Sequence, residues 1–249
     1  MLTTDQLQAI MPQLPPAKTA TLFPFLTAAV GEFAIEQPAR TAAFLAQLAH
    51  ESAQFRFMEE IWGPTAQQRR YEPPGNLADR LGNTERGDGK RFKGRGPIQI
   101  TGRANYRRFG DLLGLDLIAD PDLAARPNVA FRIAGLFWSK KGLNELADLV
   151  TAEAFREITR RINGGFNGLE ERERFYESAR RVLQVIAPPR PRGGAPVSEE
   201  ADEPAFDRGH EAIRVDAAQA RSRKTGRKKP TLKKRRAKPG AKARGRKRT

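Results

Sequence analysis

The amino-acid sequence predicts a mainly α fold with a few short β segments, followed by a charged C-terminal tail. Apolar residues recur three or four positions apart through much of the first 187 residues, which is the spacing of one helix face. Residues 92–101, FKGRGPIQIT, combine glycines with alternating β-branched residues and favour short extended segments. The last 29 residues contain 16 Lys and Arg and no acidic residue, so they cannot form an apolar core.

Helices are predicted wherever this spacing is flanked by residues that suit helix ends. Thr3 and Gln6 have the spacing of a capping box at the start of the first helix. Pro127 suits a first helical turn, and Thr151 suits an N-cap. The predicted helices cover residues 3–10, 20–32, 40–55, 127–142, 151–163 and 170–185.

Residues 63–95 interrupt this pattern. They are rich in Gly, Pro, Asn and Asp, and only a short helix around Leu77–Leu81 is expected among them. Loops of this length inside a compact domain are usually functional. We therefore expect part of a functional site in or beside this segment.

Composition excludes several kinds of site. The chain has no cysteine, which excludes disulfides and thiolate metal ligands. Its two histidines, His50 and His210, are far apart, so neither a metal site nor a cofactor is expected. The first residues lack the pattern of a secretory signal. The chain also contains no run of 18 apolar residues, the length needed to span a membrane. We expect a monomer that is made in the cytoplasm without a signal peptide and acts on a cell wall or extracellular polymer if it is released.

The net charge of +16 arises entirely from the tail, because residues 1–220 contain as many basic as acidic residues. The sequence therefore predicts a folded body (1–187), a linker rich in Pro, Ala and acidic residues (188–220) and a disordered basic tail (221–249). Such a tail can bind a polyanion, for example nucleic acid or an anionic envelope polymer. The alternative is a solvated extension without a partner.

Glu51 is the first candidate for chemistry. It lies on the apolar face of the predicted helix 40–55, in register with Phe44, Leu48 and Phe55. A carboxyl group on a core-facing side loses solvation, which raises its pKa and favours the protonated form. A protonated carboxyl is what a glycosidase uses to protonate the leaving sugar oxygen. By position alone, a Glu that reaches solvent or pairs with an arginine is the alternative.

A second carboxylate follows at Glu60, with Glu59 beside it. An inverting glycosidase needs a base across the sugar from the acid, far enough away to leave room for a water molecule. Glu60 stands where the predicted helix has ended and the long loop begins. It can therefore serve as that base, although a solvated loop acid is the alternative.

Four separated segments resemble glycoside hydrolase family 19, the chitinase-like family that includes many phage and bacterial endolysins. In order along the chain they are FLAQLAHESAQF (44–55), GRGPIQITGRANY (94–106), ITRRINGGFNG (158–168) and ERERFY (171–176). The resemblance covers roughly residues 3–186 and excludes the tail. It implies a lysozyme-like domain of two helical lobes around a central cleft. The implied activity is endo-acting, inverting hydrolysis of β-1,4 bonds in N-acetylglucosamine polymers, either chitin or peptidoglycan.

The resemblance also implies roles for individual residues. Glu51 matches the general acid, and Glu60 matches the acidic residue that activates water. The positions that match substrate-binding or site-supporting residues are Thr65, Gln99, Thr101, Asn105, Tyr106, Asn163 and Arg172. Arg172 corresponds to an arginine linked to the acid pair, and the amide side chains suit N-acetyl groups and hydroxyls. Tyr106 and Trp62 are aromatic faces that could stack on a sugar ring or pack in the interior.

The sequence departs from the family around the base, where it reads EEIWGPTAQ instead of an Asn-rich stretch. Trp62 and Pro64 stand where smaller or polar residues are usual, so the choice between Glu60 and Glu59 stays open. Two other functions also stay open. One is a catalytically silent sugar-binding module, and the other is a polyanion-binding protein that acts through its basic tail.

Overall fold

The computed structural model describes residues 1–186, so the expected linker (188–220) and tail (221–249) lie outside the described residues. The described chain is mainly helical. Its elements are α1 (Thr4–Ile10), α2 (Pro16–Glu32), α3 (Pro38–Glu51), α4 (Ala66–Arg69), α5 (Asn76–Leu81), α6 (Asp88–Arg91), α7 (Arg103–Leu113), the 3-10 helix η1 (Pro121–Ala125), α8 (Pro127–Lys140), α9 (Leu143–Asp148), α10 (Ala152–Asn163) and α11 (Leu169–Val182). No helix within residues 1–186 is both long and apolar enough to cross a membrane.

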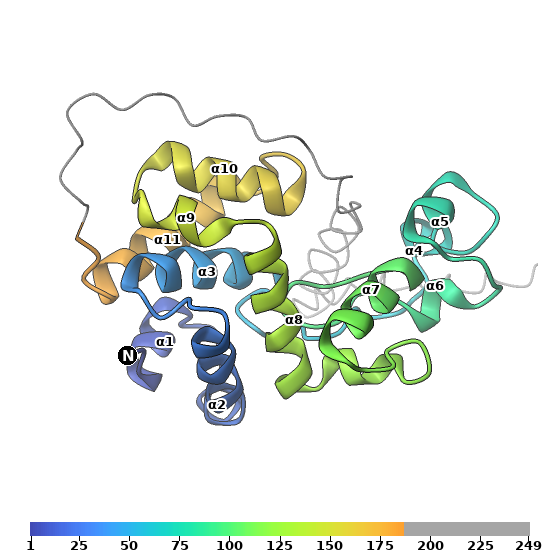
Figure 1. The fold of residues 1–249 in the computed structure, drawn as a ribbon, viewed down its shortest axis with the longest axis horizontal. Helices are drawn as coiled ribbons and strands as arrows, with labels where there is room; N and C mark the ends of the chain where they lie inside the picture. Colours follow the sequence, from blue (N-terminus) through green and yellow to red (C-terminus); the bar gives the residue numbers. More distant parts are fainter. Residues whose placement is uncertain (187–249) are drawn as a thin grey trace, which may run out of the picture.

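The helices form two groups that lie side by side (Figure 1). One group contains α1, α2, α3, α9, α10 and α11, and the other contains α4 to α7. Helix α8 lies between the two groups and packs on α2 and η1. This arrangement agrees with the two helical lobes that the sequence predicts.

Helix α3 forms the centre of the first group. Its residues from Thr41 to Ala49 are all buried, and it packs most extensively on α11. An apolar face alone was predicted for this helix, but α9 also packs against it. The helix is therefore a core element on nearly all sides, and its last residue, Glu51, is buried as well.

The chain leaves α3 earlier than the sequence predicts. Ser52 caps the helix, and Ala53, Gln54 and Phe55 follow with φ angles of 49°, 61° and 57°. The Ser52 hydroxyl holds this turn, because it donates to Leu48 O at 2.6 Å and accepts from Phe55 N at 2.8 Å. Three successive left-handed residues without glycine are unfavourable, and such strain is typical of functional sites. The strained turn places Phe55 in the core and leaves Glu51 at the helix end.

Several other predictions need correction in detail. Helix α2 begins at Pro16, four residues before the predicted start, because a proline suits the first turn. The segment 63–95 contains α4 and α6 in addition to the predicted short helix α5. Helices α7 and α9 were not predicted at all. The predicted extended segments are confirmed only as two isolated antiparallel bridges, Glu59 with Arg95 and Arg95 with Ile100.

Candidate active site

Glu51 lies at the C-terminal end of α3 and is bound by an arginine that other residues orient. It is 7% exposed, and its Oε1 accepts a hydrogen bond from Nη2 of Arg172 on α11. Arg172 is itself 1% exposed and is oriented by two further bonds, to Gln47 Oε1 at 2.5 Å and to Asn167 O at 3.2 Å. Gln47 lies one turn before Glu51 on α3 and donates to Thr159 Oγ1 of α10 at 2.9 Å. Helices α3, α10 and α11 therefore jointly fix the position of the Glu51 carboxyl.

Two opposing effects act on the ionisation of Glu51. Burial disfavours its charged form, whereas the Arg172 guanidinium favours it. From its position alone, a Glu51 that pairs with an arginine was an alternative to a catalytic acid, and the structure contains such a pair with Arg172. The family resemblance implies the same pair. The pair is therefore compatible with Glu51 as the acid and with Arg172 as the residue that positions it.

Glu60 forms a second buried carboxyl group. It is 5% exposed, and its Oε2 accepts from the backbone N–H of Gly94 at 2.9 Å. The backbone N–H of Glu60 in turn donates to Gly94 O at 2.8 Å. A Cβ atom on Gly94 would lie 3.4 Å from Glu60 Oε2 and 2.7 Å from Gln99 Oε1, so the first glycine of the segment 94–96 permits this close approach.

Gln68 of α4 supplies the other contact to Glu60. Its Nε2 donates to Glu60 Oε1 at 3.0 Å and to Ile61 O at 2.9 Å. Its Oε1 accepts from the backbone N–H groups of Gly63 and Thr65, at 3.1 and 2.8 Å. One fully buried amide thus holds the carboxyl group of Glu60 and the loop that follows it. Thr65 acts here as the N-cap of α4, with Gln68 completing a capping box.

Glu59 has a different environment. Its side chain is 44% exposed and forms ion pairs with Lys93 at 3.1 Å and Arg95 at 3.2 Å. Two cations therefore occupy the Glu59 carboxylate. The Glu60 carboxyl group, by contrast, is buried and accepts hydrogen bonds from the Gln68 amide and the Gly94 N–H. The contacts therefore favour Glu60 over Glu59.

Gln99, Thr101 and Asn105 lie in one chain of hydrogen bonds. Gln99 has a φ of 54° and donates to Gly96 O at 2.7 Å and to Phe57 O at 3.2 Å. Thr101 donates to Gln99 O at 3.1 Å, and Asn105 donates to Thr101 O at 2.8 Å. Asn105 is partly exposed. The Gln99 Oε1 is buried and has no hydrogen-bond partner among residues 1–186.

Tyr106 does not have the open aromatic face that a stacking role requires. It is fully buried, its ring lies 5.2 Å from that of Phe92, and its hydroxyl donates to Lys93 O at 2.6 Å. Arg95 donates to the same hydroxyl at 2.9 Å. Burial raises the pKa of Tyr106 strongly, and the nearby Arg95 lowers it only in part. Tyr106 is thus an interior residue here, and direct contact with a sugar is a wrong expectation for this conformation.

The remaining predicted residues lie around these two carboxyl groups. Asn163 ends α10, is partly exposed, and donates to Asn167 O at 3.5 Å, the same oxygen that Arg172 contacts. This places Asn163 beside the support of Glu51. Trp62 is partly exposed and packs on Tyr71, with 6.2 Å between the ring centroids. His50 Nδ1 lies 2.8 Å from Glu171 Oε2 and so joins the end of α3 to α11.

Sequence reasoning missed three supporting residues: Gln47, Gln68 and Arg95. The Thr65–Gln68 spacing is itself a capping-box signal, so Gln68 could have been found. Arg95 is 4% exposed and pairs with Glu59 and Asp122. The sequence around it indicated a role only for the two glycines on either side. Gln47 carries no local signal, because its partners Thr159 and Arg172 lie more than a hundred residues away.

Comparison with known proteins decides the family. Residues 17–147 match the family model described as chitinase class I. A glycosyl hydrolase family 19 domain-containing protein of Haemophilus influenzae is 38% identical over 160 residues, which cover 55% of this chain and 76% of that protein. The chain belongs to glycoside hydrolase family 19. The family predicted from the four segments is therefore confirmed, and the members of this family are glycosidases.

Other members of the family are similar over part of the chain. An endochitinase of Arabidopsis thaliana is 43% identical over 125 residues, which cover 50% of this chain and 39% of that protein. Chitinase C of Streptomyces griseus has a solved structure that matches with a TM-score of 0.58 at 21% identity, over 76% of this chain and 78% of that one. The second likeness confirms the mainly α, lysozyme-like fold.

Proposed function

We propose that this family 19 member is an endo-acting glycosidase that cleaves β-1,4 bonds in N-acetylglucosamine polymers with inversion. Glu51 is the acid and Glu60 is the base. The observation that supports this proposal is a pair of buried carboxyl groups, each held by its own set of donors from separate elements. The names of the relatives favour chitin, and peptidoglycan contains the same type of bond.

The mechanism assigns one proton to each carboxyl group. Glu51 gives its proton to the glycosidic oxygen as the bond to the anomeric carbon breaks. Glu60 takes a proton from a water molecule, whose oxygen forms the new bond from the opposite face of the sugar. Arg172 stabilises the Glu51 carboxylate that remains, and Gln68 and Gly94 keep Glu60 aimed at the water.

The test is hydrolysis of chitohexaose, followed by NMR of the early product and run in parallel on purified peptidoglycan. We expect the α anomer from the β bond, because a single displacement inverts the configuration. Glu51→Gln and Glu60→Gln should each lower kcat by at least about a hundredfold, the usual range for losing an acid or base. Glu59→Gln is the matched control and should retain most activity.

Three results would overturn the proposal in different parts. A β anomer would exclude inversion, and equal losses in Glu59→Gln and Glu60→Gln would remove the distinction between the two neighbours. Binding of both polymers without hydrolysis would mean a silent sugar-binding module. The basic tail, which lies outside the described residues, is proposed as a separate polyanion contact. Deleting residues 221–249 should remove salt-sensitive polyanion binding and leave hydrolysis of soluble oligosaccharides intact.

A further inference from the structure

A cationic hollow lies between α7 and the end of α8. Its volume is 520 Å³, and it is lined by Ala104, Arg107, Arg108, Asp111, Leu112 and Lys140. Three of these six residues are cationic and one is anionic. Helix α7 belongs to one group of helices and α8 lies between the groups, so the hollow is at the boundary of the two lobes (Figure 1).

Two of the cations in this hollow are unpaired in the described part of the chain. Arg107 and Lys140 are exposed and have no side-chain hydrogen bond or ion pair among residues 1–186. Other surface arginines in the described chain are paired, as Arg132 is with Glu32 at 2.7 Å and Arg40 is with Asp148 at 2.6 Å. Unpaired cations of this kind, gathered at a concave surface, attract an anion.

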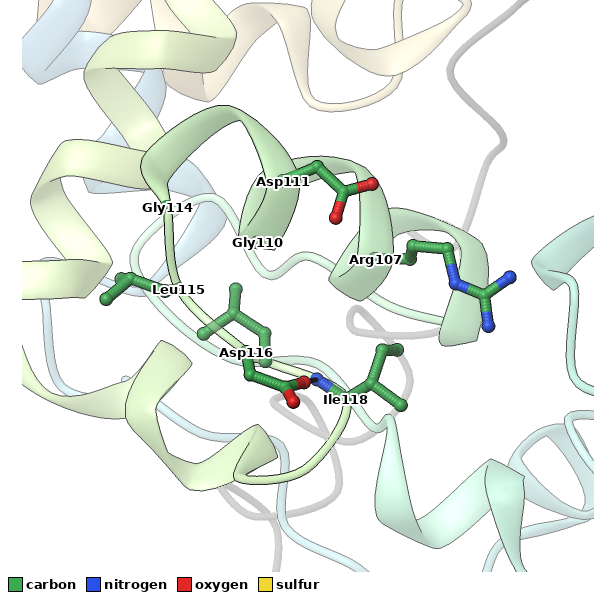
Figure 2. A pocket seen from close by; sticks show the side chains of 8 residues that line it. Arg107, Gly110, Asp111, Gly114, Leu115, Asp116 and Ile118 are labelled. Carbon is green, nitrogen blue, oxygen red and sulfur yellow. Dashed lines mark hydrogen bonds between the residues drawn. The ribbon is translucent and has the colours of Figure 1, made fainter.

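A second hollow that adjoins the first one on α7 provides a contrast. Its volume is 480 Å³, and it is lined by Arg107, Asp111, Asp116 and Ile118, among others (Figure 2). Asp116 lies in the loop after α7, where its carboxylate accepts the backbone N–H groups of Ile118 and Ala119 at 3.1 and 2.9 Å. Two carboxylates and one guanidinium line this hollow, so its lining does not favour an anion. The excess of cations is therefore in the hollow that contains Lys140.

The cationic hollow adjoins the candidate substrate residues. Asn105 is partly exposed on α7, next to Ala104 and three positions before Arg108. Residues three apart on a helix are neighbours on its surface. A polymer that contacts Asn105 therefore passes within side-chain reach of Arg108 and of the hollow beyond it.

We propose that Arg107, Arg108 and Lys140 form a subsite for a carboxylate carried by the glycan substrate. The inference rests on the proposed glycosidase function and adds a substrate class to it. An unsubstituted N-acetylglucosamine polymer has no charge for this subsite, whereas a strand that bears lactyl or peptide carboxylates does. Arginine suits the role because its planar guanidinium can bind both oxygens of a carboxylate.

The experiment compares two soluble forms of one backbone, neutral glycol chitin and anionic carboxymethyl chitin, with the full-length chain. The measured quantity is the ratio of kcat/KM on the anionic polymer to that on the neutral polymer. Arg107→Gln combined with Lys140→Gln should lower this ratio by about fivefold, as expected for losing two partly exposed ion pairs. The wild-type ratio should also fall with added salt, because exposed charges are screened.

Arg86→Gln combined with Lys90→Gln is the matched control. Both residues are exposed and line neither hollow, and the control variant removes the same number of positive charges as the test variant. The basic tail is present in every variant, so its attraction for an anionic polymer cancels. An equal ratio in the test and wild-type enzymes, or an equal fall in the control, would overturn the subsite. Failure of the wild type to cut glycol chitin, carboxymethyl chitin and purified peptidoglycan alike would instead overturn the glycosidase proposal.

Discussion

Replacing Gln68 by Met would show how much of the loop around the proposed base depends on one amide. Methionine keeps the length and flexibility of the side chain but removes its polar atoms. Gln68 loses its bonds to Glu60 Oε1 (3.0 Å) and Ile61 O (2.9 Å), and Gly63 N and Thr65 N lose their acceptor at 3.1 and 2.8 Å. The side chain is 0% exposed, so water cannot easily replace the bond to Glu60.

The expected cost follows from these four bonds. A neutral hydrogen bond contributes about 1 kcal/mol and a bond to a charged group about 1.5–3 kcal/mol, while the three partly buried groups regain some of this from water. We expect the free energy of unfolding to fall by about 2–4 kcal/mol. With a urea dependence of about 2 kcal/mol/M, the unfolding midpoint should fall by about 1–2 M at an unchanged slope.

Gln67→Met is the control for this substitution, because Gln67 is the adjacent residue of α4 and its side chain, within residues 1–186, accepts only an exposed hydrogen bond from Arg70 at 3.0 Å. Its unfolding free energy should change by less than about 0.5 kcal/mol. If both variants unfold at the same midpoint, Gln68 does not hold the loop. If Gln68→Met also keeps the full kcat at low temperature, where it is folded, its contact with Glu60 does not serve the reaction.

Three further predictions concern packing, pH and buried polar groups. Gly110→Ala should destabilise the protein by about 1–3 kcal/mol, because the new Cβ would lie 2.5 Å from a backbone oxygen. Gly31→Ala is the control: its Cβ would have no neighbour closer than 3.6 Å, so it should stabilise its helix by up to about 1 kcal/mol. Equal midpoints of the two variants in thermal melts would contradict this prediction. Burial raises the pKa of Asp88, but hydrogen bonds from Arg103 and two backbone amides lower it overall below its ordinary value of 3.8. The stability that this lowered pKa contributes is present above about pH 4 and is lost as the pH falls. Arg103→Gln should therefore lose less unfolding free energy than the wild type between about pH 5 and pH 2. Parallel plots of unfolding free energy against pH for the two proteins would refute the role of Arg103 in lowering the pKa of Asp88. Tyr106→Phe removes two buried hydroxyl bonds and should lower the unfolding free energy by about 1–2 kcal/mol in urea titration without abolishing hydrolysis, which a sugar-contacting role would not allow.

Features with a local cause were predictable from the sequence. Thr3 forms its capping box with Gln6, Thr151 caps α10, and Pro127 begins α8, as their spacing indicates. The helical period also placed Glu51 on a buried surface. Short helices such as α9 escaped, because six residues are too few for a period to stand out.

The site itself depended on both levels. Motif resemblance selected Glu51 and Glu60 from many acids, and their burial is now evident. It also named Tyr106 as a residue near substrate, whereas packing against Phe92 encloses it. A sequence motif preserves residue identity but does not state whether a side chain contacts the ligand or supports a neighbour that does.

The sequence by itself therefore determined the family, the helical class and the two carboxyl groups, because these depend on short-range periodicity and on residue types at fixed spacing. Only the tertiary structure decided their partners. Glu51 and Arg172 are 121 residues apart in the chain, and Glu60 and Gly94 are 34 apart. Such pairs form only when whole segments of the chain pack together. Their free energy depends on burial and on the distance between the two groups, and neither can be read from the sequence around either residue. The unpaired cations between α7 and α8 arise in the same way, from helices that carry their charges separately until the fold brings them together.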